Sequence, residues 1–278
     1  MMYLILAILS SMAIAVVMRL SEKHISNNIS MLSANYLMCA LLSFLFTGGI
    51  HGNASTEGLP FALGFGIFNG VLFLVGFLLY QWNIRKNGVT LSALFMKMGV
   101  IISVVTAICF FHETPKILQI VGMGIACIAI FVIHSEKGSA KVASGLGLIV
   151  LFCVGGLTDA TSKIYEELGV ASMKNGFLLF TFLSAFLLSL CLCLVKKQKL
   201  TKMDALMGFL LGVPNYFSAR FLLYSMAEIP AVIAYPTFSV GTIITVMAVS
   251  WLLFKERLSK TQKIAMGLIL VALVLLNV

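Results

Sequence analysis

Hydrophobic stretches of similar length follow one another along the whole chain, separated by short polar breaks. They cover residues 2–20, 30–49, 60–84, 88–111, 116–135, 143–164, 174–195, 204–227, 231–254 and 260–277. At a rise of about 1.5 Å per residue, each is long enough for a helix to cross the roughly 30 Å hydrocarbon core of a bilayer. Backbone groups in lipid need partners within their own segment, which favours helices. The pattern predicts an all-α integral membrane protein with ten transmembrane helices.

The second half of the chain repeats the first at a constant offset. The shift is 143 residues from Glu113 to Glu256, and again from Gln119 to Gln262 and from Gly124 to Gly267. Five spans per half is an odd number, so the second half must enter the membrane from the opposite side. We therefore expect two inverted five-helix repeats, a construction found in many secondary transporters. Residues 1–137 would form the first repeat and 138–278 the second, within one membrane domain.

Composition strengthens the membrane interpretation. The chain is 60% hydrophobic and only 10% charged, whereas soluble domains are about 45–50% apolar and about 25% charged. The mean hydropathy is +1.07. We expect the lipid bilayer to be the main surroundings of the protein.

The net charge of +9 comes from cations in short loops. One set of loops carries 14 of the 19 lysines and arginines, whereas the alternate set carries only Lys116 and Lys174. By the positive-inside rule the basic loops are cytoplasmic. This predicts a multi-pass protein of the cell membrane with both termini on the same side, the outside. No basic patch with interleaved aromatic residues lies outside the spans, so no nucleic-acid partner is expected.

Metal, cofactor and catalytic sites are not expected. The six cysteines all lie within apolar runs without zinc-ligand spacing, and the four histidines are scattered near span ends. No nucleophile stands beside a base, and no glycine-rich phosphate loop occurs. A membrane-embedded enzyme and a non-transport membrane scaffold remain lesser alternatives.

Charged residues within spans are functional candidates, because each costs about 2.5–3.5 kcal/mol on insertion scales. Asp159 and Lys163 are four residues apart, so a helix places them on one face. They form either a self-neutralising ion pair or a cavity element in which substrate or a proton competes for one partner. Lys97 lies about two turns inside the fourth span and is a candidate for cavity lining.

A polar stripe in the eighth span is the strongest candidate binding site. Tyr216, Arg220 and Tyr224 recur every four residues, and Pro214 and Asn215 interrupt the helix just before them. A guanidinium offers a planar fork for carboxylate or phosphate, and the rings offer a stacking surface. The alternative is a hydrogen-bond network inside the bundle.

Asn69, Tyr235 and Ser239 complete the set of candidate cavity residues, although each alone is as readily explained by packing. The charges within spans sum to +2, because three cations stand against Asp159. That sign suits a substrate bearing a carboxylate or phosphate. The alternative is an exporter of organic cations or drugs that uses Asp159.

The paired motifs give the chain a family resemblance. They are Phe111-His112-Glu113 with Gln119 and Gly124, and Leu253-Phe254-Lys255-Glu256-Arg257-Leu258-Ser259 with Gln262 and Gly267. With ten spans in two halves, the chain resembles the EamA-like branch of the drug/metabolite transporter (DMT) superfamily. The resemblance implies a central cavity lined by the first, third, fourth, sixth, eighth and ninth spans, with the fifth and tenth peripheral. We expect Glu113 and Glu256 to be structural, each favouring the following helix N-terminus, with gating as the alternative.

The predicted function is secondary transport of a small polar metabolite by alternating access. Its partner would be a small molecule such as an amino acid, an organic acid or another anionic or zwitterionic solute. The sequence leaves the substrate, the direction of transport (export included), coupling to a proton or ion, and a monomeric or homodimeric state open.

Overall fold

The computed structural model describes residues 1–47, 58–134 and 145–254, and further positions 260, 264, 267–268, 271–272 and 274–275. The helices of the first half are α1 (Met2–Ser21), α2 (Asn28–Thr47), α3 (Leu59–Asn87), α4 (Val89–Met98), α5 (Val100–Phe111) and α6 (Ile117–His134). Those of the second half are α7 (Gly145–Leu168), α8 (Lys174–Val195), α9 (Lys202–Ser225) and α10 (Ala231–Phe254), with a short 3-10 turn at Ala171–Met173.

Each predicted span from the first to the ninth corresponds to described helix. Seven of the described helices are long and apolar enough to cross a bilayer, so the chain is a multi-pass membrane protein. The fourth span is divided into α4 and α5, which the sequence pattern did not predict. The tenth span lies largely outside the described residues, and the count of ten helices stays a prediction.

The division of the fourth span falls at Gly99, where the chain passes very close to α7. A Cβ atom at Gly99 would lie 2.3 Å from the backbone nitrogen of Gly156, and one at Gly155 would lie 2.7 Å from the carbonyl oxygen of Met96. Only glycines allow the two backbones to approach this closely, as small residues do between membrane helices. This contact holds the fourth span against the sixth.

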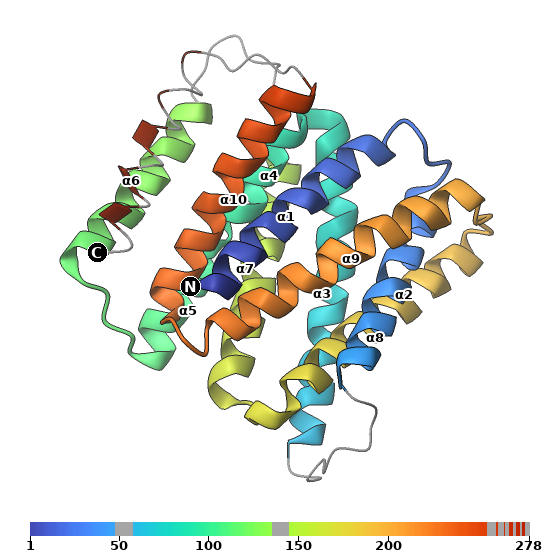
Figure 1. Ribbon diagram of the computed structural model, residues 1–278, viewed down its shortest axis with the longest axis horizontal. Helices are drawn as coiled ribbons and strands as arrows, with labels where there is room; N and C mark the ends of the chain where they lie inside the picture. The colour runs from blue at the N-terminus through green and yellow to red at the C-terminus, as the bar shows by residue number, and fades with distance from the viewer. Residues whose placement is uncertain are drawn as a thin grey trace.

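The two halves interlock rather than lying side by side. In the first half α2 packs against α9, and its counterpart α8 packs against α3. Likewise α1 contacts α9 and α10, while its counterpart α7 contacts α3, α4 and α5. Figure 1 shows α1, α9 and α10 crossing the face toward the viewer, with α6 at one edge of the bundle. The exchange of partners between corresponding helices fits a two-repeat architecture.

Corresponding helices begin at opposite ends of the bundle. The amino group of Met1, at the start of α1, pairs with Glu228 just beyond α9. Asn83, near the end of α3, donates to the carbonyl of Gly147 at the start of α7. The first helices of the two halves therefore run in opposite directions, as inverted repeats require. The predicted boundary at residues 137 and 138 lies outside the described residues and stays a prediction.

The described basic loop residues gather at one end of the bundle. Arg85 donates to Asn28 there, joining the end of α3 to the start of α2. At the same end Asp204 forms a capping box with Thr201 and also accepts from the backbone N–H of Ser26. The opposite end carries Glu228 and the α5–α6 link. The separation of the two loop sets that the sequence predicts is thus present among these residues.

Candidate functional site

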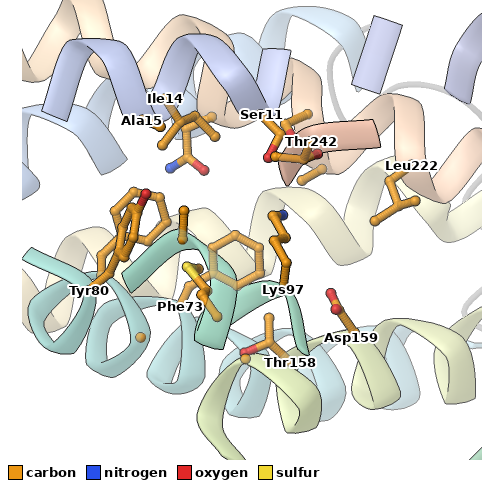
Figure 2. A pocket seen from close by; sticks show the side chains of 18 of the residues that line it. Ser11, Ile14, Ala15, Phe73, Tyr80, Lys97, Thr158, Asp159, Leu222 and Thr242 are labelled. Atoms are coloured by element: carbon orange, nitrogen blue, oxygen red, sulfur yellow. The ribbon is translucent and has the colours of Figure 1, made fainter. Parts of the chain in front are cut away.

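One cavity lies between helices of both halves, and six helices contribute to it (Figure 2). These are α1, α3, α4, α7, α9 and α10, which correspond to the first, third, fourth, sixth, eighth and ninth spans. The space free of protein atoms is about 850 Å³ including its mouth. The helices that line it are those that the family resemblance implies.

Two opposite charges face this cavity. Lys97 enters from α4 and Asp159 from α7. The Lys97 ammonium lies 4.1 Å from the centre of the Phe238 ring, and it interacts electrostatically with the Asp159 carboxylate. No salt bridge joins the two groups within the described part of the chain. Each charge is therefore available to a ligand.

The remaining walls are mostly apolar and aromatic. Phe73, Phe77 and Tyr80 of α3 line one side, and Phe238 of α10 lies on another. Such walls exclude water and offer a surface for an apolar or flat side chain. The cavity thus combines two fixed charges with a mainly hydrophobic enclosure.

Of the two alternatives for Asp159 and Lys163, the ion pair between them is not what the structure shows. Lys163 instead pairs with Glu113 and with Glu167, one turn later on α7. Only 3% of its side chain is exposed, and it does not line the cavity. Although the spacing allows the ion pair, a carboxylate from the α5–α6 link lies closer to Lys163. This leaves Asp159 to face Lys97.

Glu113 contacts the N-terminus of a helix, but not that of the following helix. Its Oε2 accepts a hydrogen bond of 3.0 Å from the backbone N–H of Val232, in the first turn of α10, and its Oε1 pairs with Lys163. A carboxylate there satisfies a free amide and favours the positive end of the helix. The helix it stabilises is not the following one, α6, because α10 of the other half packs nearer. Glu256 lies outside the described residues.

Arg220 does not line the cavity, and it lies just over one turn before α9 ends. Its Nη1 donates to the Tyr216 hydroxyl at 2.5 Å. Its guanidinium lies 4.5 Å from the ring centre of Phe46 in α2 and 5.1 Å from that of Tyr224. Protein groups therefore hold it by cation–π contacts and a hydrogen bond. A role for these residues in binding substrate stays a prediction.

The reason for this separation is the geometry of α9. Asn215, Ser218 and Leu222 share one face and line the cavity. Tyr216 and Arg220 belong to a neighbouring face that meets α2. Asn215 lines the cavity as a candidate residue should, and its Nδ2 donates to Asn35 Oδ1 at 3.2 Å.

The other candidates surround the cavity without lining it. The Tyr235 hydroxyl donates to the backbone carbonyl of Asp159 at 2.8 Å and so ties α10 to α7. Ser239 and Asn69 are buried, and Ser239 Oγ and Asn69 Oδ1 have no hydrogen-bond partner among the described residues. Their part in binding stays a prediction.

Sequence reasoning missed four serine and threonine residues of the cavity, Ser11, Thr158, Ser218 and Thr242. Isolated serines and threonines are common in membrane helices, and nothing in their local sequence separates these from the rest. Within the described residues, no group of three His, Cys, Asp or Glu side chains could hold a metal ion.

Comparison with known proteins adds a family to this geometry. A model of the EamA-like transporter family matches residues 1–135 and, separately, 143–278. An uncharacterized protein of Haemophilus influenzae is 26% identical over 274 residues, covering 92% of this chain and 91% of the relative. A solved crystal structure of another protein superposes with a TM-score of 0.70 at 11% identity, covering 99% of this chain and 98% of that one. The last likeness concerns the fold alone.

Proposed function

This chain belongs to the EamA-like transporter family, and so to the DMT superfamily, and on that premise we propose a function for it. We propose that the protein carries a small zwitterionic metabolite across the cell membrane. Transport is secondary and proceeds by alternating access, with the cavity between the two halves as the binding site. A compound bearing both an amino and a carboxylate group, such as an amino acid, fits this site best.

The observation that carries the proposal is the pair of opposite charges in one cavity, between which no salt bridge is formed in the described part of the chain. A ligand carboxylate binds the Lys97 ammonium, and a ligand ammonium binds the Asp159 carboxylate. Charges in a site of low dielectric constant attract their partners strongly. A zwitterion satisfies both residues at once, whereas a simple anion or cation satisfies only one.

The charge balance of the cavity also favours a zwitterion over a plain anion. The sequence predicted an excess of two positive charges, counting Lys163 and Arg220 as cavity groups. Lys163 pairs with Glu113, and Arg220 is held by aromatic groups elsewhere. The cavity therefore contains one cation and one anion and has no net charge from side chains. The alternative substrate is an organic cation that binds at Asp159, because the aromatic walls of the cavity can also contact a cation.

Ligand-induced stabilisation of the purified protein tests the proposal. Thermal unfolding is measured with the twenty protein amino acids, organic acids and organic amines, for the wild type, Lys97→Met, Asp159→Asn and a control. A ligand that binds only the folded state must raise the unfolding temperature. The control is Lys86→Met, which removes an exposed cation at the end of α3.

We expect amino acids to stabilise the wild type and the control, and to lose that effect in both cavity variants. Stabilisation by amines alone, lost only in Asp159→Asn, would establish the organic-cation alternative instead. Stabilisation by acids alone, independent of Asp159, would contradict the zwitterion and favour a simple anion.

The orientation is a second part of the proposal. The excess of basic residues at one end of the bundle supports a cytoplasmic position for that end, and therefore supports an outside position for both termini. Reporter fusions at the two termini test this, using one reporter that is active only outside the cytoplasm and one that is active only inside. Activity of the inside reporter at either terminus would contradict the proposal.

A further inference from the structure

Resting on the proposed function, we propose that Ser11, Thr242 and Lys97 form an oxyanion subsite that binds the carboxylate of the substrate. Asp159 and Thr158 form the opposing subsite for the ammonium group. The cavity is thus polarised, and it fixes the direction in which a zwitterion lies.

Thr242 differs from other threonines in the transmembrane helices. Thr106, Thr158, Thr161, Thr181 and Thr245 each donate to a backbone carbonyl one turn earlier, at 2.7–2.9 Å. The Thr242 side chain is 1% exposed, and its hydroxyl has no hydrogen-bond partner among the described residues. A buried hydroxyl without a partner costs free energy unless a ligand or water satisfies it. Thr242 is one of the residues that line the cavity, so a ligand bound there is a partner for this hydroxyl.

The positions of the neighbouring groups place Thr242 at the end of the cavity toward which the Lys97 ammonium points. Phe238, whose ring lies under that ammonium, is four residues before Thr242 and so shares its face of α10. The backbone of Gly241 packs closely on Ile8 of α1, one turn before Ser11. Figure 2 shows the Lys97 ammonium pointing toward the end of the cavity where Ser11 and Thr242 lie. An ammonium and two hydroxyls can together donate several hydrogen bonds to one carboxylate.

The hydroxyls at the two ends of the cavity differ in what they can offer. Thr158 donates its proton to the carbonyl oxygen of Val154, at 2.8 Å. Only its lone pairs remain, and these accept from an ammonium beside Asp159. Within the described residues the Thr242 hydroxyl donates to no protein group, so it can donate to a carboxylate. Donors therefore gather at the Lys97 end and acceptors at the Asp159 end.

Calorimetric titration with three matched probes tests the subsite. Leucine carries both charges, isoamylamine lacks the carboxylate, and isocaproate lacks the amino group. The variants are Thr242→Val, Thr242→Ser and Ser11→Ala, all in the purified full-length protein. The matched control is Thr245→Val, because the Thr245 hydroxyl already donates to the carbonyl of Gly241. Equal unfolding temperatures without ligand show that each variant is folded.

We expect Thr242→Val to weaken the binding of leucine and of isocaproate about tenfold, because a hydrogen bond to their charged carboxylate is lost. The binding of isoamylamine, which has no carboxylate, should weaken less than twofold. Ser11→Ala acts in the same direction, Thr242→Ser keeps the binding of leucine, and the control changes none of the three.

Each of the other outcomes would contradict a specific part of the proposal. If Thr242→Val weakened the three probes equally, or not at all, while Lys97→Met abolished leucine binding, the oxyanion subsite would be wrong and the zwitterion site would stand. If neither leucine nor any other amino acid bound the wild type, the proposed function and this inference would fall together.

Discussion

Lys97 and Lys163 look alike in the sequence, since both are lysines within transmembrane spans, but the fold treats them differently. Lys163 is 2% exposed and has two carboxylate partners, Glu113 and Glu167. Lys97 is half-buried, lies over an aromatic ring and faces a cavity. Lys163 belongs to the structure that holds α7, α10 and the α5–α6 link together. Lys97 lines the cavity of the candidate site.

The comparison shows what makes a charge within the membrane a binding group. The cost of burying it is offset either by a partner from the protein or by a ligand and water in a cavity. Only the second case leaves an interaction for the substrate. Four predictions test whether this distinction is correct, beginning with the largest expected effect.

Replacing Lys163 should reduce stability strongly. Lys163→Met leaves Glu113 without its cation in a largely buried position, and removing one partner of a buried pair costs about 3 kcal/mol. Denaturant or thermal unfolding of the purified protein measures the loss. Glu113→Gln in the same chain should recover part of it, because the uncompensated charge is then absent. An unchanged unfolding temperature for Lys163→Met would contradict the structural role.

Replacing Arg220 should have an intermediate effect. Arg220→Met removes the cation–π contacts with Phe46 and Tyr224 and the hydrogen bond to Tyr216, which together stabilise the protein by about 1–2 kcal/mol. Amino-acid binding should be unchanged, because Arg220 lies outside the cavity. If Arg220→Met instead lost amino-acid binding while its stability stayed normal, Arg220 would be a further contact of the binding site.

The hydroxyl of Tyr235 should contribute less. Tyr235→Phe removes its hydrogen bond to the carbonyl of Asp159, at a cost of about 1 kcal/mol in unfolding free energy. Because this bond holds the backbone that carries Asp159, binding of isoamylamine should weaken slightly more than binding of isocaproate. Equal weakening of both probes would indicate a general change of shape instead.

Replacing Lys97 should have the smallest effect on stability. Lys97→Met removes a cation without a salt bridge, so the unfolding free energy without ligand should change by less than about 1 kcal/mol. The same variant should lose ligand-induced stabilisation, as described above. A loss as large as that of Lys163→Met would end the distinction between the two lysines.

Much of the fold could be predicted, because membrane-spanning structure is decided locally. The length of each apolar run and the need to satisfy its own backbone are properties of about twenty neighbouring residues. The break at Gly99 could not be predicted in this way, since its cause is the backbone of Gly156 in another helix. The candidate site was predicted in part, with Lys97, Asp159 and Asn215 in the cavity lining.

The sequence by itself determined that the protein spans a membrane, that its halves repeat, and which family it joins. The first two follow from local composition and from a constant spacing along the chain, and the family follows from the resemblance of the paired motifs around Glu113 and Glu256. Only the tertiary structure decided that Lys163 belongs with Glu113, that Arg220 faces α2, and that Thr242 meets the cavity. Spacing along one helix shows which side chains share a face, but the partner across that face comes from another helix. The same residue type can therefore stabilise the helix bundle at one position and line a cavity at another.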